Sequence, residues 1–165
     1  MDEIKNLCIC TSSTFNTEKI LFKEITLYNS YVKMHWTVIL PVSHEELSSM
    51  EKLNVEFCTK YLHNLDFQNQ EYNFTLAEIK SYITKFCKQL PGAVFAVKGD
   101  LPLKSFLVEE CGVKTCFDLN QFGCPKYMLP SDKNNECYSF CTLHARVKCS
   151  YNIAVRYYYW KLQNY

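Results

Sequence analysis

The feature that most constrains this chain is a short run of apolar residues, Ala93-Val-Phe-Ala-Val97, set between two amphipathic segments. A strand with no polar position is typical of a sheet that is covered on both faces. Residues 103–111 predict a helix, and residues 113–119 predict a second strand. A strand, a helix and a strand in this order predict a right-handed βαβ unit with two parallel strands.

The N-terminal part of the chain predicts three further strands, at residues 7–11, 20–28 and 32–40, and residues 12–17 read as a turn. Their short connections favour an antiparallel meander. Helices are expected between this meander and the apolar strand, and a last helix is expected over residues 145–162. The whole order predicts a single α/β domain spanning residues 1–165. Its fold would be RNase H-like, with a mixed five-stranded sheet of order 3-2-1-4-5 flanked by helices.

Two capping-box patterns mark the expected starts of the two middle helices. Ser43 is followed three residues later by Glu46, and Thr75 is followed at the same offset by Glu78. A Ser or Thr in this position accepts a hydrogen bond from the backbone of the third helical residue, whose side chain bonds back. We therefore expect one helix to begin at Ser43 and the other at Thr75.

The acidic residues of an RNase H-like nuclease are missing from the expected first strand, which reads Cys8-Ile-Cys-Thr-Ser. Nucleases of this fold bind two metal ions through clustered carboxylates. Asp100 and Asp118 follow the later strands, but two acids alone cannot build that site, and we interpret Asp118 as a turn residue. Two-metal hydrolysis is therefore not expected.

The ten cysteines and the lack of long apolar runs restrict the setting of the protein. No signal peptide is expected at the start of the chain, and no segment is long enough to span a membrane. Cysteines are mostly reduced in the cytosol and nucleus, where they behave as small buried hydrophobes. We expect a cytoplasmic or nuclear protein that does not enter the membrane.

A cluster of possible metal ligands lies near the C-terminus, where Cys141, His144 and Cys149 fall within nine residues. Zinc prefers four ligands in a tetrahedron, drawn from Cys, His and sometimes a carboxylate. The cluster therefore predicts a zinc site, although these residues could instead be reduced core residues. Four residues elsewhere could supply the fourth ligand: Glu24, His35, Cys124 and Cys137.

This pattern resembles the MAEL domain of Maelstrom proteins, an RNase H-like fold related to the DnaQ exonucleases whose catalytic acids are lost. The family has a Glu on the second strand, then Cys-x2-His and a later Cys before the last helix. The resemblance implies that Glu24 joins Cys141, His144 and Cys149 around a structural Zn²⁺. It also implies binding of single-stranded RNA and a role in piRNA-guided transposon silencing. The gap between His144 and Cys149 is shorter here than in that family.

The C-terminal segment is locally basic, because no Asp or Glu follows Glu136. Its four cations are Arg146, Lys148, Arg156 and Lys161. Aromatic residues lie between them. In proteins that bind single-stranded RNA, cations typically contact the phosphates and aromatic rings stack on the bases. The alternative is an amphipathic helix whose rings are core residues and whose cations are solvated.

Three functions remain open at this point. The chain is expected to be a zinc-stabilised, catalytically degenerate module that binds single-stranded RNA. The alternatives are a protein-interaction adaptor of a silencing complex and a metal-independent endonuclease acting on single-stranded RNA.

Overall fold

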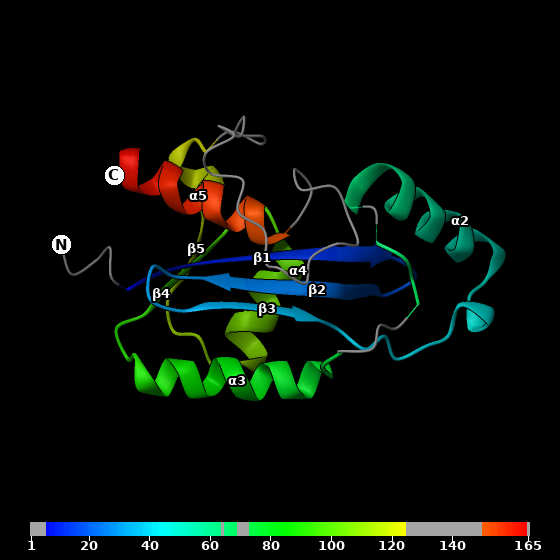
Figure 1. Cartoon of the computed structure of the whole chain (residues 1–165), viewed down its shortest axis with the longest axis horizontal. Helices are drawn as coiled ribbons and strands as arrows, with labels where there is room; N and C mark the ends of the chain where they lie inside the picture. Colours follow the sequence, from blue (N-terminus) through cyan, green and yellow to red (C-terminus); the bar gives the residue numbers. More distant parts are fainter. Residues whose placement is uncertain (1–5, 64, 69–72, 125–149, 165) are drawn as a thin grey trace.

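The computed structural model describes residues 6–63, 65–68, 73–124 and 150–164, and the centre of the fold is a five-stranded sheet (Figure 1). The strands are β1 (Leu7–Asn16), β2 (Ile20–Tyr28), β3 (Lys33–Thr37), β4 (Val94–Val97) and β5 (Cys116–Asp118). Their order is β3-β2-β1-β4-β5. The β1–β2 and β2–β3 pairs are antiparallel, and the β1–β4 and β4–β5 pairs are parallel. The predicted α/β class and the RNase H-like order 3-2-1-4-5 are confirmed.

Helices cover both faces of this sheet. They are η1 (His44–Glu46), α2 (Ser49–Phe57), η2 (Cys58–His63), α3 (Leu76–Gln89), α4 (Leu101–Ser105), η3 (Phe106–Glu110), η4 (Leu119–Phe122) and α5 (Ser150–Asn164). In Figure 1, α3 lies below the sheet, α5 lies above it, and α2 lies to the right. Among the described residues, no helix combines the length and the apolar character needed to cross a bilayer.

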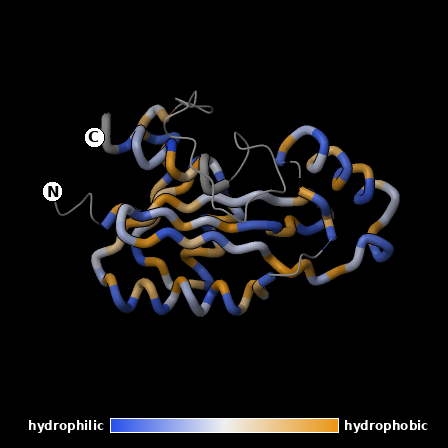
Figure 2. The backbone as a smooth tube through the Cα atoms, viewed as in Figure 1, coloured by the Kyte–Doolittle hydropathy of each residue, from blue (hydrophilic) through white to orange (hydrophobic). Residues whose placement is uncertain are grey.

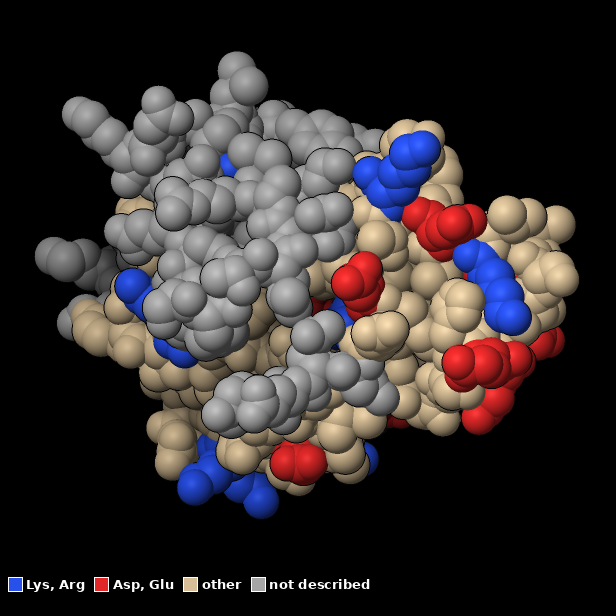
Figure 3. Space-filling view, turned by 45° about the vertical axis from the view of Figure 1, so that its right-hand side comes forward, with Lys and Arg blue, Asp and Glu red and all other residues tan. Residues whose placement is uncertain are grey.

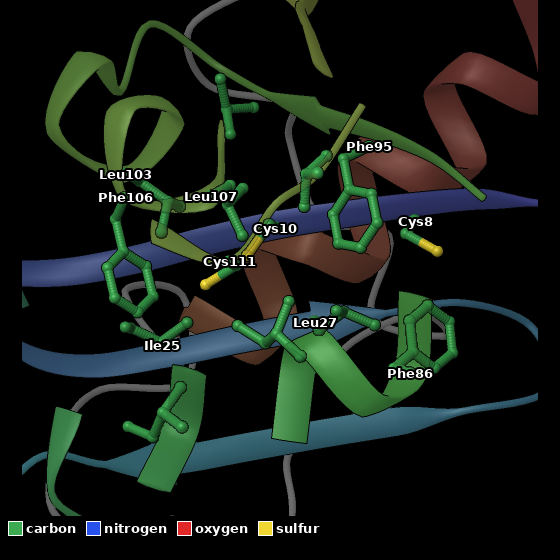
Figure 4. Packing of buried hydrophobic residues seen from close by; sticks show 14 of the residues in the cluster. Cys8, Cys10, Ile25, Leu27, Phe86, Phe95, Leu103, Phe106, Leu107 and Cys111 are labelled. Carbon is green, nitrogen blue, oxygen red and sulfur yellow. The ribbon is translucent and has the colours of Figure 1, made fainter. Parts of the chain in front are cut away.

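The larger core cluster lies between the sheet and the side covered by α3, α4 and η3. Cys8, Cys10 and Phe95 of the sheet are fully buried there, against residues such as Leu103 and Leu107 (Figure 4). Figure 2 shows hydrophobic and hydrophilic residues alternating along α3, as expected for a helix with one buried face. The apolar face of α3 is supplied by Ile79, Ile83 and Phe86, which are buried in this cluster.

A second core cluster lies on the opposite face, under α5. Ile9 of β1 and Ala96 of β4 are fully buried in it, together with Ala154 and Trp160 of α5. Successive side chains of a strand point to opposite faces, so β1 and β4 contribute to both clusters. The prediction that residues 93–97 form a strand buried on both faces is confirmed by this packing.

The first strand is longer than its sequence indicated. The polar residues after Thr11 were expected to form a turn, but β1 continues to Asn16. The polar side chains find partners far away in the sequence: Ser12 Oγ donates to Asp100 Oδ2 at 2.5 Å, and Ser13 Oγ donates to Glu24 Oε1 at 2.9 Å. These bonds offset the cost of burying hydroxyl groups, so the strand extends through a stretch that reads locally as a turn.

The two expected capping boxes had different outcomes. Thr75 caps α3, and its side chain and backbone exchange hydrogen bonds with Glu78 as predicted. The prediction at Ser43 is wrong, because Ser43 precedes only the short 3-10 turn η1 and makes no side-chain cap bond. The capping box of α2 is formed five residues later by Ser48 and Glu51. The last helix is described from Ser150 onward, and residues 145–149 lie outside the described residues.

Candidate functional site

The candidate site is a group of polar side chains on the α5 side of the sheet. Tyr28 of β2 packs in the cluster under α5. Because side chains alternate along a strand, Thr26 and Glu24 of β2 point toward the same face as Tyr28. Glu24 lies opposite Ser13 of β1, and Thr26 lies opposite His35 of β3. We call Ser13, Glu24, Thr26 and His35 the polar cluster.

Contacts at hydrogen-bond distance connect the side chains of the polar cluster across three strands. Ser13 Oγ donates to Glu24 Oε1 at 2.9 Å, and His35 Nε2 lies 3.2 Å from Glu24 Oε2. The other ring nitrogen, His35 Nδ1, lies 2.6 Å from Thr26 Oγ1. The side chains of Glu24 and His35 are only 3% and 2% exposed. A buried carboxylate is costly unless it is paired and hydrogen-bonded, and the Ser13 and His35 contacts meet this requirement.

Beside the polar cluster, β1 has no carboxylate. The residues of β1 that face α5 are apolar or hydroxylic, since Leu7 and Ile9 pack under the helix and Ser13 bonds to Glu24. Asp118 instead accepts hydrogen bonds from the backbone of Gly99 and Asn120, both at 2.9 Å. This geometry agrees with the interpretation of Asp118 as a turn residue.

Asp100 also has a structural contact pattern. Its side chain caps the N-terminus of α4 by accepting from the backbone of Leu103 at 3.1 Å, and it accepts from Ser12. Burial raises the pKa of the Asp100 carboxyl, while these two hydrogen bonds lower it. Ser12 packs its side chain toward the α4 side of the sheet, so Asp100 belongs to a different face from the polar cluster.

A β-bulge next to Glu24 buries a lysine. Ser13 pairs with Glu24 and Thr14 pairs with Phe22, so Lys23 is the extra residue of β2. Its side chain is fully buried, and its Nζ donates to the carbonyl of Gln68 at 2.6 Å. Burial lowers the pKa of Lys23 to about 8, partly opposed by the charges of Asp66 and Glu24. The sequence did not identify this lysine, because its alternation with apolar residues is typical of a solvent-facing strand position.

The donors of the polar cluster suit a zinc ion. At zinc–ligand distances of about 2.0–2.2 Å, two ligand atoms of a tetrahedron are about 3.3 Å apart. The 3.2 Å between Glu24 Oε2 and His35 Nε2 matches this separation, and it also suits a direct hydrogen bond. A metal-bound histidine usually donates its other N–H to a nearby oxygen, and Thr26 Oγ1 occupies that position beside His35 Nδ1.

The remaining predicted ligands are not placed by the structure. Cys141, His144 and Cys149 lie outside the described residues, as does the alternative ligand Cys137. Within the described part of the chain, no three Cys, His, Asp or Glu side chains gather closely enough to hold a metal. Glu24 is therefore the one member of the predicted set that can be located, and the alternative ligand His35 lies beside it.

None of the described cysteines is in a disulfide, and most of them are buried. Cys124, another alternative ligand, packs in the cluster under α5, and burial raises its pKa. Cys8 and Cys111 lie in the cluster on the other face, where burial raises the pKa of each to about 12. Thiols with such pKa values are protonated near neutral pH and are poor nucleophiles.

One buried histidine has a purely structural contact pattern. His63 Nδ1 accepts from the backbone N–H of Leu65 at 3.0 Å, so the proton of the neutral ring is on Nε2. That nitrogen donates to the carbonyl of Thr14 at 2.9 Å, and the ring packs edge-on against Phe15 at 4.8 Å. His63 thus fastens η2 to the end of β1.

Two of the four predicted RNA-binding cations can be located, both on α5. Arg156 is half-buried, and Lys161 Nζ lies 4.4 Å from the ring centre of Phe122 and 5.6 Å from that of Phe117. The two phenylalanine rings meet edge-to-face at 5.2 Å and are partly exposed. Arg146 and Lys148 lie outside the described residues.

The aromatic residues of α5 are mostly core. Tyr157, Tyr158 and Trp160 are buried against the sheet, whereas Tyr159 is exposed. Tyr158 packs edge-on against Tyr28 at 5.1 Å. The amphipathic-helix alternative therefore holds for three of these rings, and the partly exposed rings beside Lys161 come from β5 and η4 instead.

In comparisons with known proteins, no family model matches this chain, and no match to a curated protein was found.

Proposed function

We propose that this protein is a zinc-stabilised RNase H-like module that has lost nuclease chemistry and binds single-stranded RNA. Its pathway would be piRNA-guided transposon silencing or a related RNA pathway in the cytoplasm or nucleus, with proteins of a silencing complex as further partners. The observation that carries the proposal is the buried Glu24–His35 pair on a sheet face where β1 has no carboxylate.

Zinc would contribute stability in this site. The predicted ligands Glu24, Cys141, His144 and Cys149 form a closed set of four, and closed sites are structural because catalysis requires an open position. Glu24 lies on β2, and α5 packs on β1 and β2. Ligands that precede α5 in the sequence would connect that helix to β2, so metal binding would add directly to the folding free energy. His35 is the alternative fourth ligand, already oriented by Thr26.

RNA contact is supported by the surface around Lys161. A cation beside partly exposed rings provides a charge for a phosphate and aromatic faces or edges for bases. Phe117 and Phe122 supply the rings, and Arg146 and Lys148 are predicted to add charge from the preceding segment. Binding through phosphates is weakly dependent on sequence and is weakened by salt, because each contact releases counterions.

The zinc part of the proposal is tested by metal analysis of purified protein. We expect one zinc per chain, loss of zinc in Glu24→Gln and His144→Ala, and a lower Tm in both variants. Asp118→Asn is the matched control, since it removes a carboxylate that, among the described residues, accepts from the backbone of Gly99 and Asn120. The zinc site would be refuted if the purified wild-type protein contained no metal and the Glu24 and His144 variants had the same Tm as the wild type.

The RNA part is tested by fluorescence anisotropy with a labelled single-stranded oligoribonucleotide at several salt concentrations. We expect affinity to fall steeply with salt, and the double reversal of Arg146 and Lys148 to Glu to abolish binding while zinc is retained. Unchanged RNA affinity in that variant would favour the adaptor function. RNA cleavage that survives EDTA but is lost on one point mutation would establish the endonuclease alternative.

A further inference from the structure

The helical segment formed by α2 and η2 carries a row of large apolar side chains on its outer surface. Its members are Met50, Leu53, Phe57, Tyr61 and Leu62, which we call the outer stripe. Their exposed fractions are 67%, 60%, 54%, 55% and 46%. Positions 50, 53, 57 and 61 are spaced three or four residues apart, so they lie along one side of the segment. Scattered exposed apolar residues are ordinary, but a contiguous row of this kind marks an interaction surface.

The outer stripe is separate from the surface that attaches this segment to the rest of the protein. Val55 and Cys58 of the same segment are buried with Phe15 and Phe67 in a third core cluster. His63 adds the hydrogen bond to Thr14 at the end of η2. The segment is thus already anchored by its inner side, and the apolar outer side is not needed to bury the helix in its own domain.

Charged residues form an alternating row along one edge of the outer stripe. Lys52, Glu56 and Lys60 follow one another at four-residue intervals, and the region before them is acidic through Glu45 and Glu46 of η1. Figure 3 shows acidic and basic groups alternating over the right-hand part of the molecule, where α2 lies. The order along the segment is therefore negative, positive, negative, positive.

A row of alternating charges that begins with acidic residues and ends with a basic one is complementary to an identical row that runs in the opposite direction. In an antiparallel pair related by a two-fold axis, residue i of one copy lies opposite residue j of the other, and j lies opposite i. With the axis near position 54, Lys52 lies opposite Glu56 of the second copy. The same register places Lys60 opposite position 48, next to the acidic first turn of the second copy's α2, and it places Met50 opposite position 58, next to Phe57.

We propose that the outer stripe is the interface of a homodimer in which the α2–η2 segments of two copies pack antiparallel. Apolar side chains of the two stripes would interdigitate, and the charged edge would set the register and orientation. The antiparallel arrangement also aligns the helix dipoles favourably. This inference is independent of zinc and RNA, since the polar cluster lies on the sheet and the outer stripe lies on the far side of α2.

The size of the stripe indicates a weak and reversible dimer. The five side chains are each only 46–67% exposed, whereas a standard stable interface buries about 800 Å² on each partner. We therefore expect a dissociation constant on the order of 10–100 µM. Combined with the RNA binding proposed above, on which the dimer itself does not depend, dimerisation would double the number of RNA-contacting surfaces per particle and raise affinity through avidity.

Sedimentation velocity and light scattering over a concentration series test the interface on the full chain. The mass of wild-type protein should rise from 19.4 kDa toward twice that value as concentration increases. Leu53→Glu should weaken self-association at least tenfold, because it places a charge at the centre of the apolar contact. Leu101→Glu is the matched control, since Leu101 is at least as exposed as Leu53 but begins α4 on another surface, and this variant should dimerise like the wild type.

A charge-exchange experiment tests the antiparallel register. The contact between positions 52 and 56 occurs twice in a two-fold dimer. Either single variant, Lys52→Glu or Glu56→Lys, places like charges at both contacts, so each should weaken the dimer severalfold. The double variant restores opposite charges at both positions and should recover wild-type association. Wild-type protein that stays monomeric at about 500 µM would overturn the dimer. A dimer unaffected by Leu53→Glu would overturn this interface, and a double variant no tighter than the singles would overturn the register.

Discussion

The buried lysine in the β-bulge makes a quantitative prediction about stability and pH. Lys23 is fully buried, and its pKa falls from the usual 10.5 to about 8 because burial disfavours the charged form. Between these two values the unfolded chain holds a proton that the folded protein has released. Stability rises with pH wherever the unfolded state binds more protons, so Lys23 should make the protein more stable as the pH rises from 8 toward 10.5.

The size of this effect follows from the change in pKa. One pKa unit corresponds to about 1.4 kcal/mol, so Lys23 should contribute a gain of about 2 kcal/mol between pH 7 and pH 9.5, and about 3 kcal/mol if the whole window is covered. The buried thiols act in the opposite direction. Cys8 and Cys111 keep their protons up to a pKa of about 12, whereas unfolded thiols lose theirs near 9. They reduce stability above pH 9, so the lysine must be isolated by a mutant.

The assay is urea unfolding of wild-type protein and Lys23→Met at several pH values from 7 to 9.5. Methionine keeps the apolar length of the side chain and removes the charge. The difference in unfolding free energy between the two proteins should change by about 2 kcal/mol in favour of the wild type over this range, because the variant cannot release the proton. Lys88→Met on the exposed side of α3 is the control and should show no such trend. A difference that is constant with pH would refute the account of Lys23.

Two further predictions follow from the caps and from the first strand. Thr75→Ala should lower the unfolding free energy by about 1 kcal/mol, since it removes the side chain that caps α3, whereas Ser81→Ala on the exposed surface of the same helix should have little effect in the same urea titration. Clean protein should show no Mg²⁺- or Mn²⁺-dependent exonuclease activity on DNA or RNA, because β1 has no carboxylate. Processive metal-dependent digestion would contradict this expectation.

The sequence determined the order and the type of most elements. Residues 93–97 have no polar position, so they had to lie in a strand covered on both faces, and Ala96 and Phe95 are indeed buried on opposite sides of the sheet. The Thr75–Glu78 capping box is a local interaction between neighbours in the sequence, and for this reason its position could be read directly. Short connections among the first three strands were sufficient to predict their antiparallel pairing.

Where two equivalent local signals were present in the sequence, the tertiary structure decided which of them was used. Ser43 and Ser48 are each followed by a glutamate at the capping-box offset, but only Ser48 caps a helix. The sequence cannot rank the two, because the difference depends on burying Leu47 and Val55 in the third core cluster. Tertiary contacts also decided the length of β1. Ser12 and Ser13 are strand residues because Asp100 and Glu24 accept their hydrogen bonds.

The candidate site was predicted in part. Glu24 was identified through a family resemblance, and the sequence alone ranked it no higher than a surface carboxylate. Its contact with His35 depends on the register of β2 and β3, which places residues eleven positions apart on a diagonal of one sheet face. The burial of Lys23 depends on a bulge that shifts the register of β1 and β2 by one residue. Local sequence fixes which side chains are present, but the pairing of strands decides which of them share a buried space.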